Sequence, residues 1–253
     1  MHKNVDSVMW SDYVGEQVLF EPGEVHLWRA FFSSSLFSYD RCAYLFSEEE
    51  RVRGFRFVRV EDQQKFFFSR YVLRTLLSRY LHIAPEKIIF SFGQNGKPFV
   101  SHDDVQFNLS HSGNCVLLGV TMQNEIGVDV ECIRKKYDFL ALAKRFFAAA
   151  EFDAIHHYCS EREKIAAFYR CWTRKEAFIK ATGLGLSFGL SDFEVSVAEI
   201  LSDCSALSHV RSDVLQAKKW WLQSISMNEL SEDYFAAFAI DGKPSSILCR
   251  NFS

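Results

Sequence analysis

The sequence lacks a strong net charge. Its 253 residues carry 29 Lys and Arg against 32 Asp and Glu, which gives a formal charge of -3 at pH 7. No global positive field therefore points to nucleic acid as a partner. An anion can only be held by a local cluster of cationic side chains.

The sequence also lacks a paired cysteine pattern and a long apolar run. Its seven cysteines are scattered and include no Cys-x-x-Cys pair, so neither a disulfide framework nor a cysteine zinc site is expected. No stretch reaches the apolar length of a membrane span, and the N-terminus shows no apolar run behind a basic start. We therefore expect a soluble, cytoplasmic protein without a membrane partner.

Apolar and aromatic side chains, in contrast, are abundant. Hydrophobic residues make up 48% of the chain and aromatic residues 15%, with 25 Phe among them. This composition excludes a disordered chain and favours a dense aromatic core. The length suits one large domain or two lobes of ordinary size.

Hydrophobic periodicity and turn signals predict an alternation of helices and strands. Helices are expected from Ser47, which begins a capping pattern, and over 62–81, 140–147 and 163–182. Strands are expected at 24–32, 87–92, 105–110, 114–121, 127–131, 192–198, 218–227 and 234–240. Turn signals lie at Asn95-Gly96 and Ser112-Gly113.

The order of helices followed by strands occurs twice, with the change near residue 122. We therefore expect an α/β fold of the α+β type with two similar lobes, residues 1–122 and 123–253, related by a pseudo-twofold axis. Each lobe should hold a small, mainly antiparallel sheet packed with helices. The active site is expected in the cleft between them.

The segment from residue 172 to 186 carries the most informative pattern. Helical spacing puts Trp172, Glu176 and Lys180 in one stripe. A surface ion pair worth a few tenths of a kcal/mol, beside a core tryptophan, would explain the stripe without any function. Gly183 and Gly185 follow at once, however, and indicate a loop that passes close to something bulky.

A second pattern is the short strand 127–131. Alternation points Gly127, Asp129 and Glu131 to one face and the valines between them into a core. Such acids usually face solvent, but the bare glycine beside them suits a ligand that approaches the backbone closely. Three carboxylates and a lysine, counting Glu176 and Lys180, suit a hard cation that holds a phosphate.

Three further segments are ambiguous when taken alone. His111 lies in a polar turn within 107–113, where it could donate to a phosphate or only satisfy the turn. Lys97 lies in the hairpin turn 95–98 and is either solvated or aimed into a cleft. The arginines at 51, 53 and 56, near a fourth at 59, are most simply a solvated helix face.

Taken together, these motifs resemble the 4'-phosphopantetheinyl transferases, and most closely the long, two-lobed class that activates surfactin synthetase. The resemblance runs from about Tyr44 to the strands near 240. Its motifs are Asn-Gly-Lys-Pro at 95–98, Phe-Asn-Leu-Ser-His-Ser-Gly at 107–113, Gly-Val-Asp-Val-Glu at 127–131, Ala-Lys-Arg-Phe-Phe at 143–147 and Trp-Thr-Arg-Lys-Glu-Ala-Phe-Ile-Lys-Ala-Thr-Gly-Leu-Gly-Leu at 172–186.

The resemblance implies a magnesium-dependent transfer. The phosphopantetheine arm of coenzyme A would pass to a serine of an apo carrier protein of fatty acid, polyketide or nonribosomal peptide synthesis, releasing adenosine 3',5'-bisphosphate. Asp129, Glu131 and Glu176 match the metal ligands of the family. Glu176 also matches its general base, and Lys180 the residue that meets the α-phosphate. The family analogy further implies a monomer.

The resemblance also assigns residues to the donor, coenzyme A. Besides Asp129 and Lys180, the donor-binding positions are Arg51, Arg53, Lys97, Pro98, Ser110 and His111. Ser110 and His111 match family residues that contact the nucleotide end, His111 at the 3'-phosphate. Lys97 and Pro98 match the segment beside the adenine. Glu50 departs from the pattern because relatives often carry lysine there, which leaves open whether Arg51 or Arg53 makes the phosphate contact.

Two other functions remain open from the sequence. A module that binds coenzyme A or a carrier protein without catalysis would keep the fold and lose the chemistry. A metal-dependent phosphohydrolase or nucleotidyl enzyme would also place acids around magnesium.

Overall fold

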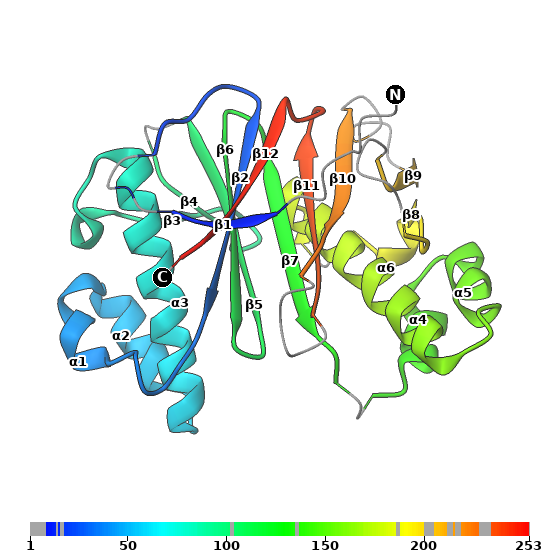
Figure 1. The fold of residues 1–253 in the computed structure, drawn as a ribbon, viewed down its shortest axis with the longest axis horizontal. Helices are drawn as coiled ribbons and strands as arrows, with labels where there is room; N and C mark the ends of the chain where they lie inside the picture. Colours follow the sequence, from blue (N-terminus) through cyan, green and yellow to red (C-terminus); the bar gives the residue numbers. More distant parts are fainter. Residues whose placement is uncertain are drawn as a thin grey trace.

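The computed structural model describes residues 9–13, 15, 18–101, 104–134, 137–185, 188–199, 205–211, 215, 219–227 and 234–252. Its helices and strands form two groups that lie side by side (Figure 1). None of the helices in these ranges is long and apolar enough to cross a membrane.

The first group is built on a five-stranded sheet in the order β1-β12-β2-β6-β5. Strand β6 pairs antiparallel with β2 and β5, whereas β12 runs parallel to β1 and β2. The strands are β1 (Trp10–Asp12), β2 (Glu24–Phe31), β5 (Val105–Ser112), β6 (Cys115–Met122) and β12 (Ser246–Asn251).

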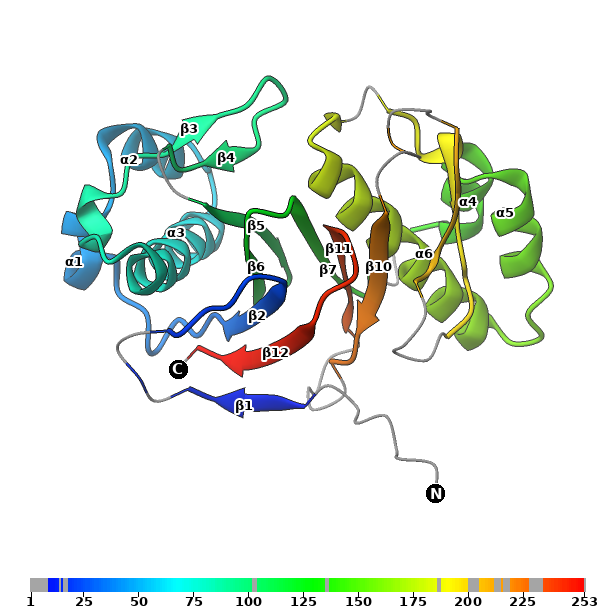
Figure 2. The same cartoon turned by 90° about the horizontal axis from the view of Figure 1, so that it is seen from above.

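Three helices belong to the first group, namely α1 (Tyr39–Cys42), α2 (Glu48–Phe55) and α3 (Val60–Leu81). Helix α3 packs its apolar face on the sheet (Figure 2), where Leu73 and Leu76 join Trp28 and Leu118 in one buried core. Helix α2 begins at a capping box, in which Ser47 accepts the backbone N–H of Glu50.

The second group is a three-stranded antiparallel sheet in the order β10-β11-β7. The long helix α6 packs on this sheet, and Phe178 shares a core with Leu222 and Ala237. The elements are β7 (Ile126–Cys132), β10 (Trp220–Ile225), β11 (Tyr234–Asp241), α4 (Phe139–Phe146), α5 (Ala149–His156) and α6 (Glu161–Thr182).

Short elements complete the structure. The hairpins are β3 (Ser91–Phe92) with β4 (Pro98–Phe99) and β8 (Phe193–Val195) with β9 (Leu207–Val210). The 3-10 helices are η1 (Ala43–Leu45), η2 (Pro85–Lys87) and η4 (Leu190–Asp192).

The two groups meet where β5 lies beside β7. These strands belong to different sheets and are not joined by a ladder of backbone hydrogen bonds. Instead, side chains of β5 accept hydrogen bonds from main-chain N–H groups of β7. The pairs, with their distances between heavy atoms, are Asn108 with Val128 at 2.9 Å, Ser110 with Val130 at 3.4 Å and Ser112 with Cys132 at 3.2 Å. We call this junction the β5–β7 seam.

Most of the predicted elements are confirmed, including the helices that became α2, α3, α4 and α6. The turns at Gly96 and Gly113 are also confirmed, with φ of 80° and 59°. The segment 87–92 is wrong as one strand, because it begins in η2 and leaves a strand of only two residues. Similarly, 192–198 holds only the three-residue β8, and residue 218 of the predicted strand 218–227 lies outside the described ranges.

Strands β1, β4, β9 and β12 and helices α1 and α5 were not predicted. Strand β12 corrects the expectation that all of 123–253 would form the second lobe. It pairs along its whole length with β2, so the last strand of the chain lies in the first sheet.

Candidate active site

Gly127 determines how closely α6 approaches β7. A Cβ atom on Gly127 would lie 2.1 Å from the carbonyl oxygen of Ala177 and 2.2 Å from the backbone nitrogen of Ala181. The sequence suggested that this bare position admits a ligand; the structure shows that it admits the backbone of α6 instead. As a result Lys180, on this part of the helix, reaches Asp129 on the strand.

Asp129 is the most buried acid of the site, with 3% of its surface exposed. Its Oδ1 accepts hydrogen bonds from the Lys180 ammonium at 2.6 Å and from the Ser110 hydroxyl at 2.9 Å. Its Oδ2 is buried and has no hydrogen-bond partner among the described residues. Burial raises the pKa of Asp129 although Lys180 opposes the shift.

Glu131 and Glu176 are half-buried nearby. The Ser112 hydroxyl donates to Glu131 Oε2 at 2.7 Å. Burial is the main reason that the pKa values of both glutamates are raised, and the negative charge of Asp129 adds to each shift. The three predicted acids therefore share one region of unfavourable negative charge, which a cation would relieve.

The donor chemistry of this region fits a hard cation such as magnesium, because carboxylate oxygens are its preferred protein ligands and Asp129 Oδ2 has no protein partner. The side chains do not yet surround one point, however. As they lie, the described part of the chain contains no group of three or more His, Cys, Asp or Glu that could hold a metal ion. The predicted ligand set would have to be gathered around the ion.

Cationic side chains gather around His111. His111 is exposed near the end of β5, and partial desolvation together with the charges of Lys180, Arg70 and Arg53 lowers its pKa. The guanidinium groups of Arg53 and Arg70 lie 5.8 and 5.5 Å from the ring centre of Phe66. The buried Nε of Arg70 has no hydrogen-bond partner within the described ranges.

These contacts bear on whether Arg51 or Arg53 contacts the 3'-phosphate. The Nε of Arg51 donates to the carbonyl of Phe46 at 3.2 Å, whereas Arg53 is one of the charges that act on His111. Arg70 was missed by the sequence reasoning. Its position four residues after Phe66 on the amphipathic helix was the available signal, because such spacing stacks two side chains on one face.

Glu50, which departs from the family pattern, has a structural role. Its Oε2 accepts the backbone N–H of Ser47 at 3.0 Å and the Nε of Arg74 at 2.9 Å. Arg74 is only 2% exposed and also donates to the carbonyls of Pro85 and Ile88. The acid therefore caps α2 and pairs with a buried arginine of α3.

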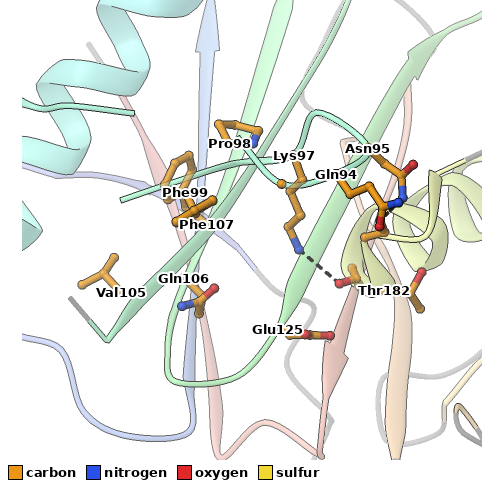
Figure 3. Close-up of a pocket in the computed structure, with 13 residues that line it drawn as sticks. Gln94, Asn95, Lys97, Pro98, Phe99, Val105, Gln106, Phe107, Glu125 and Thr182 are labelled. Atoms are coloured by element: carbon orange, nitrogen blue, oxygen red, sulfur yellow. Dashed lines mark hydrogen bonds between the residues drawn. The ribbon is translucent and has the colours of Figure 1, made fainter. Parts of the chain in front are cut away.

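Lys97 and Pro98 lie in the β3–β4 hairpin beside a cavity of about 240 Å³ (Figure 3). Lys97 points toward the end of α6, where its ammonium donates to the carbonyls of Ile126 at 2.9 Å and Ala181 at 3.1 Å. The cavity beside Lys97 is lined by the first residues of β5, 105–107, whereas His111 lies near the other end of that strand. The structure therefore does not bring these two predicted donor residues together, and Lys97 joins the hairpin to the second group.

The two glycines that follow α6 also lie where this helix meets the β3–β4 hairpin. Gly183 and Gly185 have φ of 67° and 65°, and a Cβ atom on Gly185 would lie 3.0 Å from the Asn95 side chain. Asn95 also donates to the Gly183 carbonyl at 2.8 Å. The bulky neighbour expected from the sequence is thus the hairpin.

Ser110 lies between the acids and the lysine. Its hydroxyl donates to Asp129 and accepts from the Lys180 ammonium at 3.0 Å and from the N–H of Val130. A hydroxyl has one proton and two lone pairs, so these bonds use its full capacity. The side chain is committed to the acidic side of the site, whereas the resemblance placed it at the nucleotide end.

Comparison with known proteins identifies the family. A model of the 4'-phosphopantetheinyl transferase superfamily matches residues 125–239, and a model of the N-terminal part of 4'-phosphopantetheinyl transferase matches residues 32–123. The chain therefore belongs to the 4'-phosphopantetheinyl transferase family, in its two-domain form, as the motifs predicted.

Curated relatives show the extent of the similarity. HetI, a 4'-phosphopantetheinyl transferase of Nostoc, is 35% identical over 178 residues, which are 69% of this chain and 74% of HetI. Sfp of Bacillus subtilis is 35% identical over 150 residues, 59% of this chain and 65% of Sfp. The mouse L-aminoadipate-semialdehyde dehydrogenase-phosphopantetheinyl transferase is 26% identical over 218 residues, covering 81% and 70% of the two chains.

Proposed function

We propose that the site between α6 and the β5–β7 seam transfers 4'-phosphopantetheine from coenzyme A to a serine of an apo carrier protein. The single observation that carries the assignment is the Lys180–Asp129 contact at 2.6 Å beside the unpartnered Oδ2 of Asp129, in a chain of this family. It supplies an ammonium and a carboxylate oxygen that a bound pyrophosphate and its cation could use.

In the proposed reaction the serine oxygen forms a bond to the phosphorus that carries the pantetheine arm. The bond from that phosphorus to the bridging oxygen breaks, and adenosine 3',5'-bisphosphate leaves with the electron pair. Glu176 takes the serine proton as the general base, the role that its match to the family implies.

Lys180 is proposed to stabilise the leaving phosphate. Its side chain is 29% exposed, and its ammonium already lies beside the acids, so a phosphate oxygen could become an additional or replacement partner. Charge-assisted hydrogen bonds of this kind strengthen as negative charge grows on the leaving oxygen.

Asp129, Glu131 and Glu176 are the residues that would hold magnesium. When bound, magnesium would neutralise the pyrophosphate and orient it. The repulsion between these three acids would be relieved only when a cation is bound. Binding of the donor with its cation would therefore complete the site.

Donor recognition is proposed to divide between the two ends of β5. Arg53, Arg70 and His111 would bind the 3'-phosphate, because the two guanidinium groups lie at the same Phe66 ring and their charges act on His111. Pro98 and Lys97 would border the adenine beside the hairpin cavity. Arg51 is left out of this set because it binds the carbonyl of Phe46.

The wider architecture remains part of the proposal. We infer two pseudo-twofold-related lobes that divide near residue 122, with β12 returning to the first lobe and the active site in the cleft between the lobes. We infer a monomer because both lobes lie in one chain. The free thiols of the described cysteines suit a reducing cytoplasm. A stable trimer in light scattering would contradict the monomer.

Incubation of the protein with coenzyme A, magnesium and an apo carrier protein tests the function. We expect the carrier mass to rise by one phosphopantetheine, and a panel of carriers would identify the pathway served. Free nucleotide products without a modified carrier would support a hydrolase, and binding without any product would support a silent binding module.

A further inference from the structure

Ser112 makes two hydrogen bonds at the β5–β7 seam. Its hydroxyl donates its only proton to Glu131 Oε2 at 2.7 Å and accepts the N–H of Cys132 at 3.2 Å. The side chain is 4% exposed, so water offers little competition for these bonds. The main-chain contact fixes the hydroxyl relative to β7, and the hydroxyl in turn fixes one oxygen of the glutamate.

The other two seam side chains differ from Ser112 in what they hold. Asn108 accepts the N–H of Val128 and, among the described residues, bonds to no acid. Ser110 shares Asp129 with Lys180, so the carboxylate of Asp129 keeps a second partner if the serine is lost. Of these three seam side chains, only Ser112 donates a hydrogen bond to Glu131.

We propose that Ser112 is a positioning residue that presents the carboxylate of Glu131 to the metal, an inference that rests on the proposed function. By holding Oε2, the hydroxyl restricts the rotamers of the Glu131 side chain, so less side-chain entropy is lost when the ligands gather, and it leaves the other carboxylate oxygen to the metal. Groups that orient metal ligands in this way typically change metal affinity by about 10- to 100-fold when removed.

The test compares Ser112→Ala with Asn108→Ala and Ser112→Thr. Asn108→Ala is the matched control, because it removes a seam bond to the same strand without touching an acid. Two quantities are measured for each protein: the Mn²⁺ dissociation constant, from free Mn²⁺ by electron paramagnetic resonance with and without coenzyme A, and the magnesium concentration that gives half-maximal transfer.

We expect Ser112→Ala to weaken Mn²⁺ binding and to raise the magnesium requirement about tenfold or more, while Asn108→Ala lowers stability and leaves both metal readouts near wild type. Ser112→Thr keeps the hydroxyl and should restore them. Equal metal readouts in Ser112→Ala and wild type, or equal losses in the two alanine variants, would overturn the proposal.

Two safeguards keep the outcome clear. If Ser112→Ala does not fold, Ser112→Cys takes its place, because a thiol is only a weak donor and of similar size. If wild type binds Mn²⁺ but modifies no carrier, the proposed function fails, whereas the Mn²⁺ comparison still decides the role of Ser112.

Discussion

At the scale of single residues, burial separates two lysines of the same helix. The ammonium of Lys175 is fully buried, pairs with Glu151 at 2.7 Å and donates to the carbonyls of Leu190 and Phe193, so its protons are used within the protein. The side chain of Lys180 is 29% exposed, and its ammonium donates to Asp129 and Ser110 of the site. The first lysine holds α6 in place, and the second is available to a substrate.

The role of Glu176 leads to a prediction about turnover. Glu176→Gln keeps the shape of the side chain and removes the proton acceptor, so kcat should fall about a hundredfold or more with a much smaller change in coenzyme A affinity. Steady-state kinetics with a carrier protein measure both. Glu161→Gln is the control, since that acid is 70% exposed on the same helix. A change confined to coenzyme A affinity would argue against catalysis by Glu176.

The cation group around His111 leads to a prediction about donor choice. Dephospho-coenzyme A lacks the 3'-phosphate, so Arg53→Ala and Arg70→Ala should each reduce the preference for coenzyme A over this analogue. A lost bond to a charged group is worth about 1.5 to 3 kcal/mol, which corresponds to roughly tenfold or more in the ratio of kcat/KM values.

Arg51→Ala is the matched control for that ratio, because Arg51 binds the carbonyl of Phe46 instead. Its ratio should stay at the wild-type value. A ratio that falls in Arg51→Ala and holds in the other two variants would return the phosphate contact to Arg51.

At the scale of secondary-structure elements, the packing of α6 on β7 depends on Gly127. In Gly127→Ala the added methyl group meets backbone atoms of Ala177 and Ala181 at 2.1 and 2.2 Å, so the helix must move. We expect a loss of about 1 to 3 kcal/mol in the free energy of unfolding. Transfer activity should fall as well, because the same movement separates Lys180 from Asp129.

Denaturant unfolding and the carrier assay measure these two losses. Gly93→Ala is the control, since the nearest atom to its added methyl group would be the Lys97 carbonyl oxygen at 3.7 Å. If Gly127→Ala had the wild-type free energy of unfolding, α6 would lie farther from β7 than the structure shows, and the prediction would be wrong.

Local signals explain which elements could be predicted. The capping pattern at Ser47 and the apolar spacing within 62–81 depend on neighbours in the sequence, and both helices formed as expected. The seam at Ser112 and the close contact at Gly127 depend on which strand or helix arrives from elsewhere. Their residue types were visible in the sequence, but their partners were not.

The candidate site likewise contains residues that local signals could predict and residues that they could not. The acids and Lys180 could be predicted because spacing within one strand and one helix sets their faces, and the resemblance joined the two. Arg70 was missed because its place near His111 depends on how the first group of helices packs on the sheet. The contact of Lys97 with β7 could not be predicted because it depends on where the β3–β4 hairpin lies.

At the scale of the whole molecule, strand β12 ties the two groups of elements together. The chain leaves the second sheet after β11 and returns to pair with β2, so the first sheet is complete only when the last strand is in place. A buried polar network lies beneath this strand. His26 is fully buried, its Nδ1 is 2.8 Å from the Tyr80 hydroxyl, and its Nε2 is 3.2 Å from a carboxylate oxygen of Glu24.

This network leads to a prediction about acid stability. Burial, and then the charge of Arg250 on β12, lower the pKa of His26 to about 4, although Glu24 opposes the shift. The unfolded chain takes up a proton near pH 6.5, whereas the folded protein does so only near pH 4. This histidine therefore makes the free energy of unfolding fall as the pH drops from 6.5 to 4, by up to about 3 kcal/mol.

Three acids of the candidate site change the free energy of unfolding in the opposite direction as the pH falls. The effect of His26 must therefore be measured by comparing a histidine variant with wild type. Asp129, Glu131 and Glu176 have raised pKa values, so the folded protein binds their protons first and gains stability as the pH falls. Urea unfolding between pH 7 and 4.5 should give a weaker loss of stability toward acid in His26→Gln than in wild type, whatever the absolute stability of the variant. His209→Gln, at an exposed position of β9, should keep the wild-type slope. Equal slopes in wild type and His26→Gln would show that the histidine is not held neutral beneath β12.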